Sequence, residues 1–500
     1  MSQYVKVIPK FTRGTLCLAR YSGRWRQLTE GAWVLTFRGS LGGHMKISEL
    51  GKKAAIWAVL AGALLVVSAS AESKARIVRL SDVQGSVQMD RGTGDGFDKT
   101  FLNMPVVEEF RLKTGDDGRA EVEFEDGSAL RIVPNSEVEF TRLALGDDGQ
   151  KLSSMQLVAG MGYVNYRGKS HDQFTLNFGR ESVTLAEAAH FRIGLRNNEA
   201  TVAVIKGRLN VNGQSGPIEV DQKHTATFDV DSDRYDVAKK YEEISYDAWD
   251  KQQSEYHDRY ASNGNSRNSS PYAYGMSDLN YYGSYRSLPG YGMVWQPYFM
   301  DASWSPFQDG GWVYYPGAGY MWVSSYPWGW MPYRYGNWAF VPGFGWAWQP
   351  GYWNSWYAVP RVVNPPRRVS VPVPPVRGRG TVMLGRGLTV NPVSGLPQRV
   401  MIAPGSAGLG IPRGTVRNLD RVARTVNKDN RAVEVRTESR GRIAPPPSGS
   451  TAGNVSSGNS GSRPPSSPSP PSRVSSPRMP SSPAPSRMPS GPPVRSNKPH

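Results

Sequence analysis

Apolar and polar residues alternate in short runs across residues 76–235, with turn-forming residues between the runs. The run RAEVEFE at 119–125 is typical, because Ala120, Val122 and Phe124 lie on one face of an extended chain and three glutamates lie on the other. Since side chains point to alternate faces of a strand, this pattern predicts a strand with one face in a core and one face in water. The Asp-Gly that follows at 126–127 favours a tight hairpin turn.

Similar runs predict a mainly β fold for residues 76–235. Further strands are expected at 128–133, 157–166, 173–178, 182–185, 189–195, 200–205 and 208–211. About ten short strands with no helix between them indicate a β-sandwich of two sheets or a partly closed barrel.

Residues 236–260 follow a different period. Tyr241, Trp249 and Tyr256 recur with helical spacing, and acidic residues lie near the start of the segment. This pattern predicts a short helix near 239–258. The polar residues at 261–270, rich in Asn and Ser, are expected to form a linker.

Residues 271–360 contain an internal repeat. Aligning 304–326 with 330–352 gives nine identities in 23 positions, and Trp295 with its neighbours resembles a truncated earlier copy. Each unit has a Gly-x-Trp run, a Pro-Gly turn and a returning run with a second tryptophan, which predicts one β-hairpin per unit. Because a lone hairpin is marginally stable in water, the copies are expected to stack through their rings.

The tryptophans of this repeat have two interpretations, and the sequence leaves both open. Eleven of the fifteen tryptophans lie between Trp295 and Trp356. They form either the core of a small domain that contains almost no Leu or Ile, or exposed platforms that stack on sugars, cations or peptides. The candidate aromatic binding surface consists of Trp304, Trp312, Trp322, Trp330, Trp338 and Trp348.

Residues 45–71 have the pattern of a signal peptide. Three lysines follow Met45, an uninterrupted apolar run of 14 residues spans 54–67, and Ala-Ser-Ala precedes a cleavage site between Ala71 and Glu72. A membrane-spanning helix needs about 20 residues, so we expect cleavage and a periplasmic or extracellular product. The alternative is an inner-membrane anchor formed by residues 54–71. We expect the natural start at Met45, which makes residues 1–44 a mis-assigned N-terminal extension.

Charge divides the chain into an acidic body and a basic tail. Residues 361–500 contain 22 basic and 4 acidic residues, whereas residues 72–360 carry a net charge of −9. The tail is rich in Pro, Ser, Gly and Arg, which predicts disorder with a short ordered segment only around 381–390 or 416–435. Its scattered arginines do not indicate specific nucleic-acid binding, and we expect contacts with anionic polymers.

Residue types that carry chemistry are sparse. Cys17 is the single cysteine and the six histidines are dispersed, so neither a disulfide framework nor a metal site is predicted. The glutamates at 121, 123 and 125 share one strand face, without the contrasting environments that an acid and a base carboxylate require. The sequence therefore predicts no enzyme, no catalytic residue, no metal and no cofactor.

Several of the predicted strands resemble the FecR-type domain. The resemblance rests on Gly-Ser-Val at 85–87, Leu-Lys-Thr-Gly at 112–115, the run at 118–128 and Pro-Asn-Ser at 134–136, and it covers about 76–211. It implies an extracytoplasmic β-rich domain, which in the best-known members is the periplasmic half of an iron-transport regulator that signals to a sigma factor. The tryptophan-rich region resembles a domain of unknown function that accompanies FecR-type domains in some exported proteins.

These features together predict an exported bacterial protein with a non-catalytic binding or scaffolding role in the cell envelope. The expected partner is an envelope glycan or another envelope protein, and the sequence does not indicate an oligomeric state. The alternative is a membrane-anchored FecR-like signal transducer that regulates a sigma factor. The cleavable signal, and the lack of a recognisable sigma-factor-binding domain before Met45, favour the first interpretation.

Overall fold

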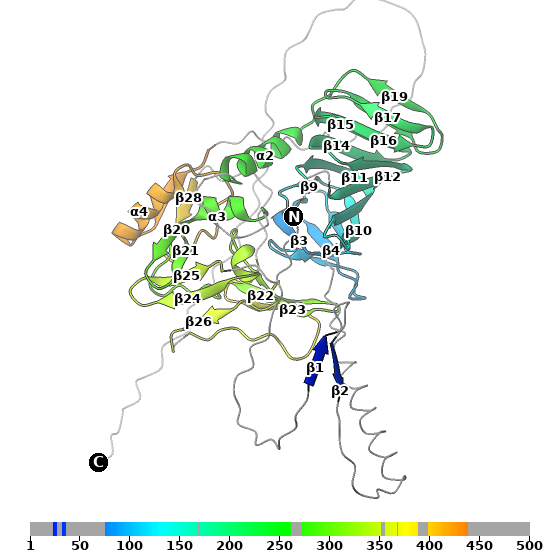
Figure 1. Cartoon of the computed structure of the whole chain (residues 1–500). Helices are drawn as coiled ribbons and strands as arrows, with labels where there is room; N and C mark the ends of the chain where they lie inside the picture. Colours follow the sequence, from blue (N-terminus) through cyan, green and yellow to red (C-terminus); the bar gives the residue numbers. More distant parts are fainter. Residues whose placement is uncertain are drawn as a thin grey trace, which may run out of the picture. The chain divides into compact units, whose positions relative to one another are not determined.

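The computed structural model describes residues 24–27, 33–36, 76–168, 171–261, 273–351, 356–367, 369–388 and 399–438. These residues all belong to one compact unit and are mainly β (Figure 1). The first two ranges are an antiparallel pair, β1 (Arg24–Gln27) and β2 (Trp33–Thr36). The expected cleavage site at Ala71 and Glu72 lies outside the described residues.

Seventeen strands, β3 to β19, form a sandwich of two sheets. They are β3 (Val78–Gln84), β4 (Val87–Asp90), β5 (Phe97–Lys99), β6 (Pro105–Val106), β7 (Arg111–Thr114), β8 (Arg119–Glu123), β9 (Ala129–Ile132), β10 (Glu137–Leu145), β11 (Lys151–Tyr166), β12 (Gln173–Phe178), β13 (Glu181–Leu185), β14 (Ala189–Arg196), β15 (Glu199–Lys206), β16 (Leu209–Gly213), β17 (Gly216–Val220), β18 (Thr225–Asp229) and β19 (Tyr235–Ala238). Sheet I has the order β6-β3-β8-β9-β11-β14-β15-β18-β19. Sheet II has the order β5-β4-β7-β10-β11-β12-β13-β16-β17. The predicted β-sandwich is confirmed, with more strands than the sequence indicated.

The long strand β11 belongs to both sheets. Its residues 152–157 pair with β12 in sheet II, and its residues 160–166 pair with β14 in sheet I. The strand changes sheets at Gly160, where φ is +85° and an added Cβ would lie 2.4 Å from the Asn135 carbonyl oxygen. Glycine is required here because a side chain would be both strained and obstructed.

The space between the sheets is filled by the apolar face of each strand. Ala120, Val122 and Phe124 are 0–1% exposed, as their alternation predicts. At about 25 cal/mol per Å² of apolar surface removed from water, this continuous core is the main stabilising contribution to the sandwich.

Three α-helices lie among the described residues: α2 (Asp247–Ala261), α3 (Met276–Tyr282) and α4 (Leu419–Asp429). Helix α2 begins at Asp247, later than the predicted 239–258, and residues 239–246 connect it to strand β19 without helix or strand. Asp247 and Asp250 occupy its first turn, where the helix dipole favours negative charge. None of the helices in the described ranges has the length and apolar composition needed to cross a bilayer.

The tryptophan-rich region forms three antiparallel hairpins. They are β20 (Gly283–Leu288) with β21 (Gly292–Pro297), β22 (Gly310–Tyr315) with β23 (Gly319–Ser324), and β24 (Asn337–Val341) with β25 (Gly345–Gln349). The predicted hairpin repeats are therefore confirmed. The first copy is complete rather than truncated, since all three turns read Pro-Gly-x-Gly, at 289–292, 316–319 and 342–345. Both glycines of each turn have positive φ and open space around them, so backbone conformation alone selects glycine.

Residues after 361 add ordered structure to these hairpins. They form β26 (Val362–Val363), which pairs with β24, and β27 (Val382–Leu384), which pairs with β22. Strands β28 (Arg399–Ile402) and β29 (Val433–Arg436) pair with each other, and α4 lies between them in the chain. The prediction of disorder from 361 onward is thus wrong for the described residues up to 438, although an ordered segment around 381–390 or 416–435 was expected. Apolar residues such as Ile402, Val416 and Val426 are spaced too widely in the sequence to reveal a core position, yet they are buried against the aromatic rings.

Candidate functional site: a buried charged interface

The outer face of β8 carries the glutamates that the sequence places in water. Glu121, Glu123 and Glu125 are instead 0%, 2% and 5% exposed. That expectation is wrong because strand alternation decides which side chains leave the core, but not what packs on the opposite face. Helices α2 and α3 and the segment around Arg413 cover this face, and together they form a charged interface.

Arg131 connects the β-sandwich to α2. It lies opposite Glu121 in the register of β8 and β9, and its Nε donates to a Glu121 oxygen at 2.7 Å. Its Nη1 donates to an oxygen of Asp250 on α2 at 2.6 Å. Because Arg131 is 1% exposed, both carboxylates are needed to compensate its buried charge.

Arg413 joins four segments of the chain at one point. Its guanidinium donates to Glu121 on β8 at 2.8 Å, and to Asp278 on α3 at 3.1 and 3.2 Å. It also donates to the Ser81 carbonyl on β3 and, at 3.3 Å, to Gln253 on α2. A planar guanidinium with five donors suits such a site, which an ammonium group could not fill.

Arg79 extends the interface to the aromatic hairpins. Its Nη1 lies 2.6 Å from Asp278 and 3.2 Å from Glu123, and its Nη2 donates to the Pro327 carbonyl at 2.8 Å. The neighbouring Asn103 side chain donates to the Ser324 and Tyr326 carbonyls. The β-sandwich is therefore hydrogen-bonded to the loop that follows β23.

His257 on α2 lies between a serine and a carboxylate. Its Nε2 donates to Glu121 at 2.9 Å, and its Nδ1 lies 3.2 Å from the Ser277 hydroxyl. This order of groups is also found in nucleophilic triads. Here the serine is 3% exposed and enclosed by the charged interface, so the arrangement orders charges within the protein.

The carboxyl groups of the charged interface have opposite pKa shifts. Burial tends to raise the pKa of Glu121, but attraction to His257 and Arg131 outweighs it and holds that pKa well below its usual value. Arg413 and Arg79 likewise outweigh burial at Asp278 and lower its pKa. Burial dominates at Glu123 and Asp82, and raises the pKa of both. The interface thus contains strongly compensated carboxylates beside less compensated ones.

The six tryptophans of the expected binding surface lie in the core instead. Trp304 and Trp312 are 2% exposed, and Trp322, Trp330, Trp338 and Trp348 are 0% exposed. The exposed-platform interpretation is therefore corrected, and the core interpretation describes the structure. Large rings take the place of Leu and Ile because each hairpin has few other apolar residues to bury.

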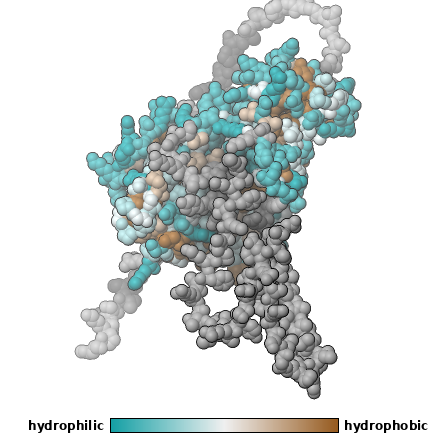
Figure 2. Space-filling view, viewed as in Figure 1, coloured by the Kyte–Doolittle hydropathy of each residue, from teal (hydrophilic) through white to brown (hydrophobic). Residues whose placement is uncertain are grey.

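Cross-strand pairing brings these rings together. Trp312 lies opposite Trp322 in the second hairpin, with ring centroids 5.3 Å apart. Trp348 lies opposite Trp338 on one side and Trp295 on the other, which connects the third hairpin to the first. Figure 2 shows only small hydrophobic areas on the described surface in view.

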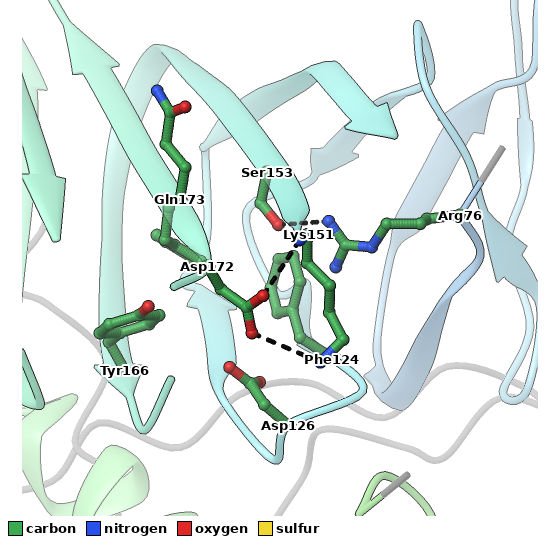
Figure 3. A pocket seen from close by; sticks show the side chains of 9 residues that line it. Arg76, Phe124, Asp126, Lys151, Ser153, Tyr166, Asp172 and Gln173 are labelled. Carbon is green, nitrogen blue, oxygen red and sulfur yellow. Dashed lines mark hydrogen bonds and ion pairs between the residues drawn. The ribbon is translucent and has the colours of Figure 1, made fainter. Parts of the chain in front are cut away.

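One small hollow lies at the edge of the sandwich, beside the start of β3 (Figure 3). Arg76 forms a buried ion pair with Glu125 at 2.6 Å and donates to the Ser153 hydroxyl at 2.8 Å. Lys151 Nζ lies 3.4 Å from Asp172 on the opposite rim. The hollow has room for about one water molecule. In the described part of the chain, no group of three or more His, Cys, Asp or Glu is arranged to hold a metal ion.

The sequence does not identify the residues of the charged interface as a group. Glu121, Asp278 and Arg413 are separated by more than 100 residues each, and nothing in their local patterns links them. Only the fold brings them to the outer face of sheet I.

Comparisons with known proteins match two separate parts of the chain. Residues 110–210 match the family described as "FecR protein", and residues 276–369 match the "Family of unknown function (DUF6600)". The expected resemblance to a FecR-type domain followed by a domain of unknown function is therefore confirmed. No curated protein matches the chain.

Solved structures give low overall similarity. A crystal structure of "a putative anti-sigma factor from Parabacteroides distasonis ATCC 8503" at 1.65 Å resolution is 13% identical, with a TM-score of 0.24; the match covers 28% of this chain and 63% of that one. A second structure with the same description, at 2.50 Å resolution, is 12% identical with the same TM-score, and the match covers 30% of this chain and 71% of that one. The chain thus spans less than two thirds of the length of the first of these proteins.

Proposed function

We propose that this chain, with its FecR-family match at 110–210 and its match of unknown function at 276–369, is a non-catalytic binding or scaffolding protein of the bacterial cell envelope. Its FecR-like sandwich and tryptophan-rich hairpins act as one rigid body. The observation that supports this most directly is the charged interface, in which Arg413 contacts β3, β8, α2 and α3 at once.

Separating the sandwich from the hairpins would cost free energy at the charged interface. Glu121 and Asp278 are both 0% exposed and share Arg413 and its neighbours. Withdrawing one partner would leave buried charges without compensation, which costs about 3–5 kcal/mol for a buried pair. A body held in this way presents its outer surfaces in a constant arrangement, which suits a scaffold.

The proposed partners are an envelope glycan or another envelope protein. The basic chain after residue 438, with eight basic and no acidic residues, contacts anionic envelope polymers in this proposal. Such contacts are electrostatic and weaken at high salt, where the Debye length falls to about 3 Å at 1 M.

Cell fractionation with mass spectrometry of the mature N-terminus tests the proposal. The expected product is soluble, extracytoplasmic and begins at Glu72. Chemical crosslinking in intact cells should then recover the protein with envelope material. A cytoplasmic product would contradict the proposed function.

A second function is favoured by the FecR-family match at 110–210, namely a membrane-anchored signal transducer that regulates a sigma factor. In that case the apolar run at 54–67 stays uncleaved as an anchor. A membrane-bound product that retains residues before Met45 would support the transducer and count against the soluble scaffold.

A further inference from the structure

The two sheets of the sandwich differ in what lies on their outer faces. The charged interface covers the outer face of sheet I at β3, β8 and β9, whereas the outer face of sheet II has a set of hydroxyl and amide side chains that are exposed or half-buried. We call this set the polar face. It consists of Ser154, Gln156, Thr175, Asn177, Ser182, Thr184, Asn210 and Asn212, which alternate with buried apolar residues along β11, β12, β13 and β16.

The strand register aligns four of these side chains in a row. Gln156 lies opposite Asn177, Asn177 opposite Ser182, and Ser182 opposite Asn212. Neighbouring strands are about 4.8 Å apart, so the row presents a hydrogen-bonding group at that interval over roughly 14 Å. A pyranose unit in an extended, equatorially linked polysaccharide has a similar length. Successive sugars can therefore face successive strands.

Several of these side chains are held over the sheet by the protein itself. The hydroxyls of Thr175 and Thr184 lie 3.2 Å apart, and the Asn177 amide donates to the Met155 carbonyl at 3.4 Å. Groups that are already ordered lose less conformational entropy when a ligand binds. Hydroxyl and amide groups each offer both donors and acceptors, as sugar hydroxyls do.

Charge selects among the ligands that could use such a face. At the outward positions of β12, β13 and β16 and of residues 152–158, none of the described side chains is ionisable. Ionisable groups of both signs begin on the flanking strands. On one side Glu139 lies opposite Gln156 and Arg142 opposite Ser154. On the other side Glu219 lies opposite Asn210 and forms an ion pair with Arg208 at 3.3 Å. A charged polymer would therefore find no ionisable partner along the row itself. The row also lacks the apolar centre that interfaces between proteins usually have, which disfavours a protein partner.

We infer that the polar face of sheet II binds a neutral, β-linked polysaccharide strand that crosses β11, β12, β13 and β16. This inference rests on the proposed role in envelope binding and specifies the chemistry of the ligand. Side-chain amides and hydroxyls hydrogen-bond the sugar hydroxyls along the row.

Isothermal titration calorimetry on the full chain tests this inference with two probes, the β-1,4-linked hexasaccharides of glucose and of N-acetylglucosamine. We expect at least one of them to bind. The variant Asn177→Ala/Asn212→Ala should weaken that binding at least tenfold. The matched control Asn198→Ala/Gln222→Ala removes two amides that are exposed elsewhere on the sandwich and should change it less than twofold.

The inference is overturned if neither hexasaccharide binds, or if the polar-face variant binds as well as the control. Circular dichroism melting of both variants establishes that each is folded. The test is independent of the fractionation experiment: an exported protein that binds neither sugar keeps its proposed envelope role and loses only this ligand. Conversely, a membrane-anchored protein that still binds the sugar would contradict the soluble scaffold and leave the inference about the polar face intact.

Discussion

At the scale of single residues, a few side chains hold segments that are far apart in the sequence. Arg413 contacts a helix 135 residues earlier and a strand 292 residues earlier. Gly160 allows one strand to serve both sheets. Each of these positions depends on a specific chemical property, a planar cation in one case and the lack of a Cβ in the other.

Replacing Arg413 with methionine should destabilise the protein by about 3–5 kcal/mol, because Glu121 and Asp278 would remain buried without their shared cation. Urea unfolding followed by tryptophan fluorescence measures the change. The control is Arg417→Met, because the Arg417 side chain is 77% exposed. This substitution should change the free energy of unfolding by about 0.5 kcal/mol or less. Equal effects of the two substitutions would contradict the role given to Arg413.

Gly160 and Gly149 provide a second matched pair. Both have positive φ, at +85° and +81°, but only Gly160 has backbone atoms in the space of a Cβ. Gly149→Ala should therefore cost about 1–2 kcal/mol from backbone strain alone. Gly160→Ala should cost a further 1–3 kcal/mol or so from overpacking. Thermal unfolding of both variants checks the difference, and similar melting temperatures would argue against the obstruction at Gly160.

At the scale of elements, the three hairpins form a domain whose core is aromatic. Their strands are short, and a single hairpin of this length is marginal in water. Cross-strand pairs such as Trp338 with Trp348 connect the strands within a hairpin, and Trp295 connects two hairpins. The chain from 399 to 438 completes this core, because Trp328 donates to the Ala407 carbonyl at 2.7 Å.

Trp338→Ala should destabilise the full-length chain by about 3–5 kcal/mol, since the ring is 0% exposed. Loss of near-ultraviolet circular dichroism at a lower urea concentration than in the unchanged protein would report the effect. Tyr235→Ala is the control, because that ring is 50% exposed and its removal should cost about 1 kcal/mol or less. A variant at Trp338 that is as stable as the control would return this ring to the list of candidate ligand contacts.

At the scale of the whole molecule, the charged interface makes stability depend on pH. Glu121 and Asp278 have lowered pKa values, so each adds stability above its usual pKa and loses that contribution as the pH falls toward the folded value. Glu123 and Asp82 have raised pKa values and act in the opposite direction, losing stability as the pH rises above about 4. The two pairs of carboxyl groups therefore give opposite pH dependences, and a single substitution is needed to separate them.

We expect the contribution of Glu121 to the free energy of unfolding to be lost as the pH falls below about 4, because the pKa of this carboxyl group is lower in the folded than in the unfolded state. The variant Glu121→Gln should be less stable at neutral pH and should show a shallower fall. Urea unfolding at a series of pH values measures both slopes. A parallel pair of curves would mean that Glu121 does not titrate with a lowered pKa.

Most elements of the β-sandwich could be predicted, because alternation is a local property of neighbouring residues. The run at 119–125 identified both the strand and its apolar face. The repeat likewise predicted hairpins from glycines that need positive φ. The burial of the six tryptophans could not be predicted, since the same spacing of rings fits both a core and an exposed platform. Only the positions of the other hairpins decide between the two.

The alternating strands and the Pro-Gly-x-Gly turns follow from the amino-acid order alone, because both depend on the conformational preferences of neighbouring residues. The family resemblance also follows from it, because it depends on particular residues at short spacings. The burial of Glu121 and Glu123, the core position of the six tryptophans and the ordered elements among the described residues of 361–438 become apparent only in the folded chain. The physical reason is that burial depends on what packs against a surface. Here the covering segments, α2, α3 and the chain around Arg413, come from more than 100 residues away in the sequence.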